Sequence, residues 1–368
     1  MRILITGGCG FLGHHIVEHL LKHTDAKIVV LDKLSYSSNG FERLRDIEVF
    51  DNQRVEILGC DLSRPIPQGV SQEIGPLDFV VHTAAETHVD NSISDPLPFL
   101  QSNVLGTHHL LWWLKERQNA PERLHVSGGD SRKLPRRIFL VSTDEVYGPA
   151  AFGDDVAGFD ETAPFRPANP YAAAKAGGEC VGMAYANTYK LPVTIVNTMN
   201  LIGERQHPEK FIPMVIRSVL ENRTVPIHAD AGLTRSGSRF YIHCRTFADA
   251  LTYLIERETF EGHRDWPTPL KLHVCGEREI TNLELAAGIA AVIGKPLRYE
   301  LVNFHSSRPG HDLRYAMSDR LITELGWQRP MMLEQSLPKM VRWYLDHPSW
   351  LGLKPEAGHA LSHPTEGL

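Results

Sequence analysis

The chain has 368 residues, 42% hydrophobic and 22% charged, and its formal net charge at pH 7 is −6. That composition is typical of a globular protein whose core needs no disulfide or metal support. The acidic balance argues against nucleic acid or an anionic membrane as a partner, and no run of about 18 apolar residues predicts a membrane-spanning helix.

The cysteines are few, scattered and never spaced C-x-x-C: Cys9, Cys60, Cys180, Cys244 and Cys275. An odd, dispersed set is typical of a reducing compartment and predicts no structural metal site. The first residues also lack the basic region, apolar stretch and cleavage site of a signal peptide. We therefore expect a cytoplasmic protein without a metal.

The first elements predict a nucleotide site. Arg2–Thr6 is typical of a strand buried on both faces, and Gly7-Gly8-Cys9-Gly10-Phe11-Leu12-Gly13 follows it. A helical pattern over residues 14–22 leads to a second buried strand, Lys27–Leu31, which ends at Asp32. The order of strand, glycine turn, helix, strand and acid indicates a dinucleotide fingerprint.

The spacing of Gly7, Gly10 and Gly13 has a physical reason. A small residue is needed for the tight turn, for the approach of a pyrophosphate and for contact between helix and strand. The helix N-terminus then offers free N–H groups to the phosphates. Asp32 is placed to accept a hydrogen bond from a ribose 2′-hydroxyl and would repel a 2′-phosphate, so we expect NAD rather than NADP, although Lys33 weakens that preference slightly.

Further strands alternate with helical patterns, and we therefore expect an α/β fold with a Rossmann-type, doubly wound parallel sheet. The predicted strands are Val55–Leu58, Asp78–His82, Arg137–Ser142 and Val193–Asn197, with a helix at Val104–Lys115. The ligand crevice of such a sheet lies at the carboxyl ends of the strands. The residues predicted there are Asp61, Ala84, Thr143 and Asn197.

In the second half of the chain, helical and strand patterns are mixed, and we expect a smaller mixed α/β substrate domain there. Its predicted elements are helices near Met214–Glu221, Thr246–Arg257, Asn282–Ile293 and Leu333–His347 and strands near Val225–Ala229 and Lys271–Cys275. We expect an NAD-binding domain over residues 1–198, to which part of 240–262 returns, a mainly substrate-binding domain over 199–348 and a tail over 349–368, of which Gly352–Leu368 is expected to be frayed. The composition of Gln118–Arg136 predicts an exposed loop. Pro149–Pro170 is either a lid over the site or a plain surface loop, and the sequence does not decide between them.

Two motifs carry chemistry: Ser142-Thr143-Asp144-Glu145-Val146-Tyr147-Gly148 and Tyr171-Ala172-Ala173-Ala174-Lys175. A Tyr and a Lys four residues apart share one face of a helix, and the ammonium is expected to lower the pKa of the phenol. Next to a nicotinamide, this pair and a Ser or Thr hydroxyl oxidise an alcohol. Two adjacent carboxyl groups, one kept protonated by burial or by the other's charge, supply both an acid and a base.

With these motifs the chain resembles the extended short-chain dehydrogenase/reductase family, and within it the nucleotide-sugar 4,6-dehydratases. The resemblance runs from Met1 to about Trp327. It also includes Ala84-Ala85-Glu86-Thr87-His88-Val89-Asp90, Pro208-Glu209-Lys210-Phe211-Ile212-Pro213 and Arg308-Pro309-Gly310-His311-Asp312-Leu313-Arg314-Tyr315-Ala316. It implies an NAD-dependent lyase that converts a dTDP- or UDP-glucose type of substrate to the 4-keto-6-deoxy sugar.

The resemblance implies roles for residues at matching positions. Tyr171, helped by Thr143 and Lys175, oxidises C4, while Asp144 is the acid and Glu145 the base of water elimination. The residues implied at NAD are Gly7, Gly10, Phe11, Leu12, Gly13, Asp32, Lys33, Asp61, Leu62, Ala84, Ala85, Thr87, Tyr171 and Lys175. Those implied at the substrate are Thr87, Asn200, Lys210, Arg239, Asn282, Arg308 and His311.

The sequence departs from the family around the expected nucleotide-sugar pocket. The family's Asn-Asn-Tyr-Gly-Pro is Asn200-Leu201-Ile202-Gly203-Glu204, and its Arg-Asp-Trp is Arg239-Phe240-Tyr241. These changes leave the nucleotide base and the sugar open. The resemblance implies a homodimer through the helices that contain Val104–Lys115 and Ala172–Tyr185. The alternatives are a C4 epimerase, a UDP-glucuronate decarboxylase type of enzyme and a non-catalytic NAD-sensing protein.

Overall fold

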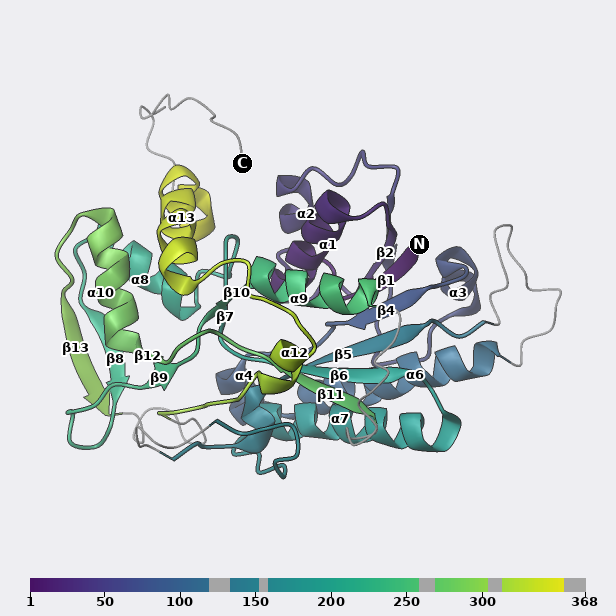
Figure 1. Ribbon diagram of the computed structural model, residues 1–368. Helices are drawn as coiled ribbons and strands as arrows, with labels where there is room; N and C mark the ends of the chain where they lie inside the picture. Colours follow the sequence, from purple (N-terminus) through teal and green to yellow (C-terminus); the bar gives the residue numbers. More distant parts are fainter. Residues whose placement is uncertain (119–132, 152–157, 258–268, 304–312, 354–368) are drawn as a thin grey trace.

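The computed structural model describes residues 1–118, 133–151, 158–257, 269–303 and 313–353. A seven-stranded sheet forms the centre of its larger part (Figure 1). All pairs of neighbouring strands are parallel. The strand order is β11 (Leu270–Val274), β6 (Val193–Thr198), β5 (Arg137–Thr143), β4 (Phe79–His82), β1 (Arg2–Thr6), β2 (Lys27–Asp32) and β3 (Val55–Gly59). The direction of winding reverses between β1 and β4, which is where such a sheet binds ligands.

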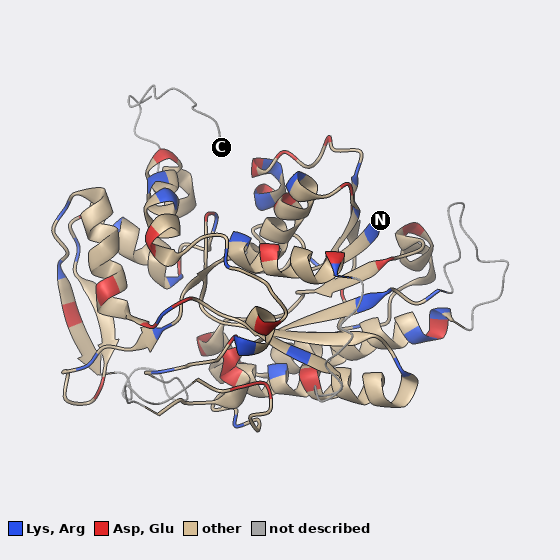
Figure 2. Ribbon diagram, viewed as in Figure 1, with Lys and Arg blue, Asp and Glu red and all other residues tan. Residues whose placement is uncertain are grey.

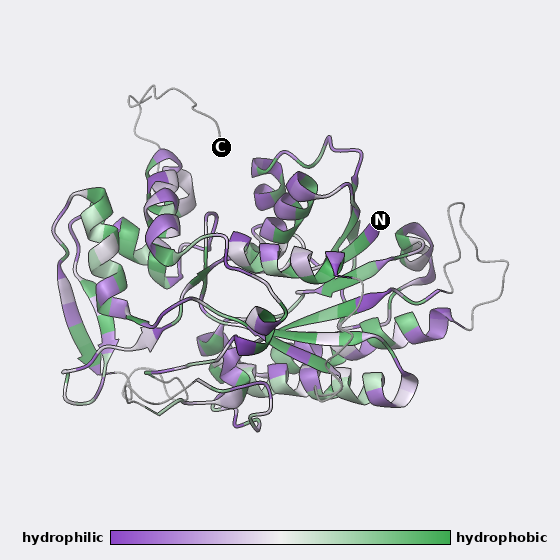
Figure 3. Cartoon of the chain, in the orientation of Figure 1, coloured by the Kyte–Doolittle hydropathy of each residue, from purple (hydrophilic) through white to green (hydrophobic). Residues whose placement is uncertain are grey.

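Helices cover both faces of the sheet because alternate strand residues point to opposite sides. Ile3 and Ile5 pack with α1 (Phe11–His23), α2 (Glu42–Asp46), α9 (Cys244–Glu256) and α12 (Arg320–Glu324). Leu4 packs on the other face with α3 (Gln68–Ile74), α6 (Gly106–Arg117) and α7 (Pro170–Tyr189). The strands are the most hydrophobic part of the picture (Figure 3), and charges of both signs are mixed along the outer helices (Figure 2).

Shorter elements follow the carboxyl ends of the strands. They are η1 (Tyr36–Ser38), α4 (Val89–Ser94), α5 (Leu97–Phe99), η2 (Leu100–Leu105) and η4 (Asp144–Tyr147). The η2 segment is a π-helical turn that runs directly into α6, and such turns are frequent at functional sites.

A second, smaller part has its own hydrophobic core at the left of Figure 1. Its elements are α8 (Phe211–Leu220), α10 (Asn282–Ile293), α13 (Leu333–Asp346), η5 (Pro348–Leu351) and the parallel pair β8 (Val225–Ala229) and β13 (Tyr299–Asn303). Two short ladders lie between the two parts: β7 (Leu201–Ile202) with β10 (Ile242–His243), and β9 (Ser238–Arg239) with β12 (Ile280–Thr281).

The predicted α/β fold and parallel sheet are confirmed, with strand ends within about one residue. Two expectations are wrong. The strand predicted near Lys271–Cys275 joins the large sheet beside β6 rather than the substrate domain, because its hydrogen bonds go to Thr194–Thr198. The tail also begins later than residue 349, since η5 buries Leu351 in the second core, and most of the stretch expected to be frayed, Gly352–Leu368, lies outside the described residues. Most of Gln118–Arg136 and residues 152–157 of the possible lid lie outside the described residues.

Within the part of the chain that the structure describes, no helix combines the length and the apolar character needed to cross a membrane.

Candidate active site

A cavity of about 610 Å³ opens at the carboxyl ends of β1, β4, β5 and β6 and continues into the second part of the molecule. The predicted site residues that line it are Gly7, Gly10, Phe11, Leu12, Gly13, Ala85, Thr87, Thr143, Asp144, Glu145, Tyr171, Lys175, Asn200, Lys210, Arg239 and Asn282. Asp32, Lys33, Asp61, Leu62 and Ala84 do not line it, and Arg308 and His311 lie outside the described residues.

The glycine turn between β1 and α1 is closed so tightly that side chains have no room. Gly7 has a φ of +73°, and a Cβ there would lie 2.7 Å from the backbone nitrogen of Ala84. A Cβ on Gly13 would lie 2.1 Å from the carbonyl oxygen of Gly7. Helix α1 starts after Gly10 with no side-chain cap, so its first N–H groups face the cavity without a side-chain acceptor. This cradle fits a dinucleotide pyrophosphate.

Asp32 is buried behind this cradle at the end of β2. Its Oδ2 accepts a hydrogen bond from the Cys9 amide at 3.0 Å, and its Oδ1 accepts one from the Leu34 amide at 2.8 Å. Burial raises its pKa above the ordinary value, while these two bonds and the charge of Lys33 act in the opposite direction. Lys33 itself forms an ion pair with Glu86 at 2.8 Å.

The other predicted cofactor residues that do not line the cavity have local roles. Asp61 is exposed, and its Oδ1 accepts a hydrogen bond from the Ser63 amide at 2.9 Å. Leu62 is buried in the core, and its carbonyl oxygen lies 2.8 Å from Nδ1 of His109. The Ala84 amide donates to the Thr6 hydroxyl at 3.3 Å, which holds the loop after β4 against the glycine turn.

The acidic pair stands where β5 ends and η4 begins. The Thr143 hydroxyl donates to Oδ1 of Asp144 at 2.8 Å, and Asn169 Nδ2 donates to Oε2 of Glu145 at 3.0 Å. Asp144 is buried, and its Oδ2 has no hydrogen-bond partner among the described residues. One carboxyl group is therefore anchored to a hydroxyl and the other to an amide, at the wall of one cavity.

Burial and the charge of Glu145 raise the pKa of Asp144 to about 7, although Thr143 and Arg239 act against the shift. Burial also raises the pKa of Glu145, which the bond from Asn169 and the charges of Arg239 and Lys210 partly offset. Asp144 is thus half protonated near neutral pH, as an acid must be. The expectation that one member of the pair is kept protonated agrees with these shifts.

Tyr171 and Lys175 lie on the first turns of α7, on the face that meets the cavity. The side chains of Tyr171 and Thr143 form a hydrogen bond, and the Lys175 ammonium donates to the carbonyl oxygen of Val141 at 2.7 Å. The expected lowering of the pKa of Tyr171 is wrong. Burial, followed by the charge of Glu145, raises that pKa, and the hydrogen bond with Thr143 only partly offsets the shift.

The predicted substrate residues come from the second part and from the short ladders. Nη1 of Arg239 donates to the carbonyl oxygens of Ser238 and Leu313, and its guanidinium stacks 4.7 Å from the centre of the Tyr315 ring. Asn282 accepts a hydrogen bond from the Tyr241 hydroxyl at 2.7 Å. Arg239 and Lys210 both lower the pKa of Glu145, so the two cations lie near the acidic pair.

Sequence reasoning missed two asparagines that shape the site. Asn169 caps α7 by accepting from the Ala172 amide, and the order Asn-Pro-Tyr is a helix-start signal that indicated this cap. Asn103, in the π-helical turn, bonds both backbone groups of Glu86, at 2.9 and 3.0 Å, and so fixes the loop that presents Thr87. No local signal distinguishes Asn103 from a surface residue.

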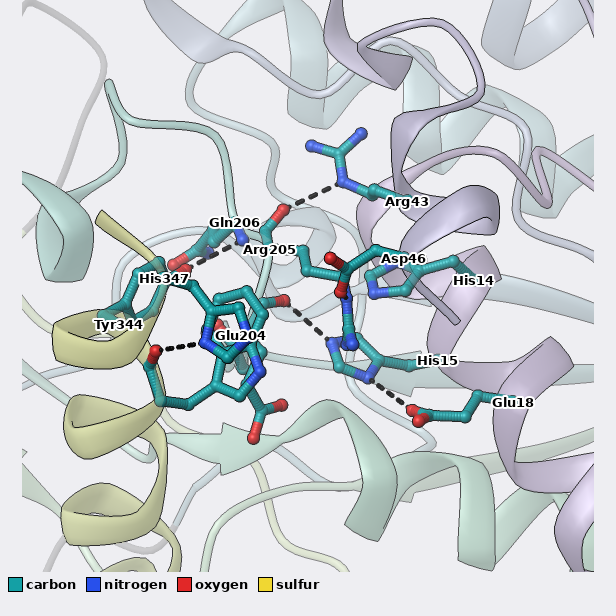
Figure 4. A network of polar contacts seen from close by, with 12 residues as sticks. His14, His15, Glu18, Arg43, Asp46, Glu204, Arg205, Gln206, Tyr344 and His347 are labelled. Carbon is teal, nitrogen blue, oxygen red and sulfur yellow. Dashed lines mark hydrogen bonds and ion pairs between the residues drawn. The ribbon is translucent and has the colours of Figure 1, made fainter. Parts of the chain in front are cut away.

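Arg43 of α2 was also missed, although it is buried and lines the cavity. Its Nε donates to the Arg205 carbonyl at 2.9 Å, and its Nη1 donates to the carbonyls of Ser37 and Ser38 at 2.8 and 2.6 Å. Burial lowers its pKa to about 10, so it stays charged. Figure 4 shows this guanidinium above a polar network that joins α1 to α13.

The chain matches the family model "NAD dependent epimerase/dehydratase family" over residues 3–266. It is 35% identical over 365 residues to a dTDP-glucose 4,6-dehydratase of Neisseria meningitidis serogroup B, which covers 95% of this chain and 94% of that one. It is 34% identical to part of a trifunctional Arabidopsis thaliana enzyme with UDP-glucose 4,6-dehydratase activity, over 99% of this chain and 50% of the other.

Among solved structures, the chain is similar to a dTDP-glucose 4,6-dehydratase of Streptomyces venezuelae with NAD bound. The TM-score is 0.78 at 31% identity, over 95% of this chain and 98% of the other. A UDP-glucuronic acid 4-epimerase of Bacillus cereus has a TM-score of 0.77 at 21% identity, and that likeness concerns the fold alone.

Proposed function

The chain belongs to the NAD dependent epimerase/dehydratase family, and we propose that within it this protein is a nucleotide-sugar 4,6-dehydratase. The reaction removes water across C5 and C6 of a dTDP- or UDP-linked glucose and leaves the 4-keto-6-deoxy sugar. The observation that carries the proposal is the Asp144–Glu145 pair, because its two carboxyl groups line the same cavity as Tyr171 and Thr143.

The proposed oxidation uses the groups at the end of β5 and the start of α7. When bound, NAD supplies the reversible oxidation of the sugar. Tyr171, in its phenolate form, takes the proton of the C4 hydroxyl, and its hydrogen bond with Thr143 both orients the side chain and opposes the rise of its pKa. Lys175 is held by the Val141 carbonyl beside this pair. The resulting C4 ketone makes the C5 hydrogen acidic, which prepares the elimination.

The elimination is assigned to the acidic pair. Glu145, held by Asn169, removes the C5 proton, and Asp144 gives its proton to the departing 6-hydroxyl, which leaves as water. Glu145 then returns a proton to C5 after C6 has been reduced. The pKa of about 7 for Asp144 supports its role as the acid, because a carboxyl group with an ordinary pKa is fully ionised at neutral pH.

The substrate end of the cavity is proposed to hold the diphosphate and the nucleoside. Arg239 and Lys210 supply positive charge, and Asn200 and Asn282 supply amides at its wall. A guanidinium suits a diphosphate because it offers donors in a planar fork. Arg308 and His311 keep their proposed nucleotide or phosphate contacts by resemblance only.

The deciding experiment compares the wild type with Asp144→Asn/Glu145→Gln on dTDP-glucose and UDP-glucose. Mass spectrometry should detect loss of one water by the wild type, and deuterium from the solvent should enter at C5. The double variant should lose at least about 100-fold in rate. Equal rates of water loss in the two proteins would show that the pair does not carry the elimination. A wild type that epimerises or decarboxylates its substrate without losing water would exclude the dehydratase and favour a C4 epimerase or a decarboxylase, which need no such pair.

A non-catalytic NAD-sensing protein makes a different prediction. It binds NAD but changes no sugar nucleotide, and it tolerates Tyr171→Phe. In an enzyme of the proposed type, this variant should retain NAD and lose turnover, since only the phenolic proton acceptor is removed. A fluorescence titration with NAD, run beside the mass-spectrometric assay, separates the two cases.

We also propose a cytoplasmic homodimer. Five apolar residues on α5, η2, α6 and α7 are at least two-fifths exposed: Leu97, Leu100, Leu105, Trp112 and Tyr189. The elements that carry them adjoin one another, and exposed apolar side chains gathered on adjoining elements are typical of a protein interface. Leu105→Glu/Trp112→Glu should therefore give a monomer in sedimentation equilibrium, whereas Tyr299→Glu on β13 should not. All five cysteines are free thiols, which supports a reducing compartment.

A further inference from the structure

A buried glutamate lies directly behind the proposed proton-transfer groups. Glu179 is two turns after Tyr171 and one turn after Lys175 on α7, so the three residues share one face of the helix. Glu179 does not line the cavity and is only 2% exposed. It therefore touches no ligand, and any effect on the reaction must pass through its neighbours.

Glu179 contacts the end of β5 through an amide. Asn197 Nδ2 donates to Oε1 of Glu179 at 2.7 Å and to the carbonyl oxygen of Thr143 at 2.9 Å. One amide group thus joins the glutamate to the residue that bonds both Asp144 and Tyr171. Asn197 is fully buried, so water cannot replace this link.

The charge of Glu179 is balanced from the neighbouring strand. Lys271 of β11 places its Nζ 2.8 Å from Oε2 of Glu179, and both side chains are buried. The ammonium also lies 4.5 Å from the centre of the Tyr147 ring and 4.6 Å from that of Phe165. A buried ion pair of this kind costs desolvation free energy that a purely apolar contact would not.

We propose that Glu179 is a positioning residue of the reaction, which keeps Lys175 charged and holds the Thr143 end of β5 through Asn197. The proposal rests on the proposed function for the use of these groups, but the state of Lys175 is measurable without it. Burial lowers the pKa of Lys175 to about 8, and the charge of Glu179 acts against that shift. Without Glu179 the pKa of Lys175 would be lower still, so a larger share of this side chain would lose its proton at neutral pH.

Three other titratable side chains lie around Lys175 and Glu179. His82 of β4 faces Lys175, but burial, reinforced by the charge of Lys175, lowers its pKa to about 3, so it is neutral. Tyr147 of η4 faces Glu179, and its pKa is raised by burial and by that charge. Burial and the charge of Glu145 raise the pKa of Tyr171. Among these groups, Glu179 is the anion that raises the pKa of Lys175.

The test measures the pKa of Lys175 by competitive labelling with acetic anhydride between pH 6 and 11, followed by peptide mass spectrometry. The labelling midpoint should be near 8 in the wild type and about one pH unit lower in Glu179→Gln. Glu179→Asp keeps the charge and should restore most of the shift. Glu161→Gln is the matched control, because Glu161 is also a buried glutamate but bonds the His273 amide instead.

Glu179→Gln leaves Lys271 buried without its partner, so the variant is repeated as Glu179→Gln/Lys271→Met, which is neutral overall. An unchanged midpoint of Lys175 in the folded single or double variant would overturn the proposal. In turnover, kcat of Glu179→Gln should fall more at pH 8 than at pH 6.5. If the wild type dehydrates no sugar nucleotide, the proposed function fails while the labelling result still decides the role of Glu179.

Discussion

Nε2 of His15 lies 3.1 Å from the carbonyl oxygen of Glu204, and the two residues are buried against each other (Figure 4). A carbonyl oxygen only accepts, so Nε2 donates. His15 belongs to α1, which begins at the glycine turn, and Glu204 belongs to the segment between Asn200 and Lys210. This bond therefore joins the cofactor side of the cavity to the substrate side.

Removing this bond should weaken substrate binding. In His15→Ala the buried carbonyl of Glu204 loses its donor, which costs about 1–3 kcal/mol of unfolding free energy, and the segment with Asn200 and Lys210 loses a support. We expect a raised dissociation constant for dTDP or UDP in calorimetric titrations. His23→Ala, at the exposed end of the same helix, is the control and should change neither quantity.

The glycine turn gives a second prediction. Gly13→Ala places a Cβ 2.1 Å from the Gly7 carbonyl, so α1 must move away from the turn and its N–H groups leave the phosphate position. The NAD content after gel filtration should fall by at least about tenfold, the equivalent of about 1.4 kcal/mol. Gly59→Ala has no atom within 4 Å of the new Cβ and should keep its NAD. Full NAD content in Gly13→Ala would contradict the proposed cradle.

The elements close to the glycine turn were predictable because their signals are local. The spacing of Gly7, Gly10 and Gly13 and the apolar runs that flank it determine a strand, a turn and a helix without reference to the rest of the chain. Asp144 and Tyr171 were predictable for a similar reason, since each follows directly on the end or start of an element that the sequence marks clearly.

The features that the sequence did not predict depend on contacts between residues that are far apart in the sequence. The residues Leu270–Val274 would suit a strand of the large sheet or one of the second part. Only the pairing of this strand with β6 assigns it to the large sheet. In the sequence, Arg43 is one of several charged residues of a short helix. Only the fold brings it next to the backbone carbonyl groups to which it donates. The pKa of Tyr171 depends on burial and on Glu145, and neither can be weighed from the spacing to Lys175.

Stability should depend on pH through His82. Its Nδ1 and Nε2 lie 2.7 and 3.1 Å from the hydroxyls of Thr6 and Thr107, and burial lowers its pKa to about 3. Below pH 6.5 the unfolded chain binds a proton here that the folded chain does not, so this contribution to stability falls as the pH falls. Between pH 8 and 5 the loss is about 2 kcal/mol.

Urea unfolding of the wild type and His82→Gln at several pH values isolates this group. The variant should be less stable at pH 8, and the difference should shrink by about 2 kcal/mol on going to pH 5, because glutamine takes up no proton. A pH-independent difference for His82→Gln would mean that His82 takes up its proton in the fold as readily as in the unfolded chain.

The pH dependence of the proposed elimination should follow Asp144. Since its pKa is raised to about 7, the acid form is lost as the pH rises through 7, and kcat for water loss at saturating substrate should fall there.

The charge of Arg239 lowers the pKa of Asp144. Arg239→Gln should therefore move the alkaline fall of kcat to higher pH, while KM rises because a cation is lost from the diphosphate end. Arg239→Lys keeps the charge and should leave the midpoint near 7, which separates the electrostatic effect from the loss of binding. A midpoint that is the same in Arg239→Gln and the wild type would show that a group other than Asp144 limits the elimination.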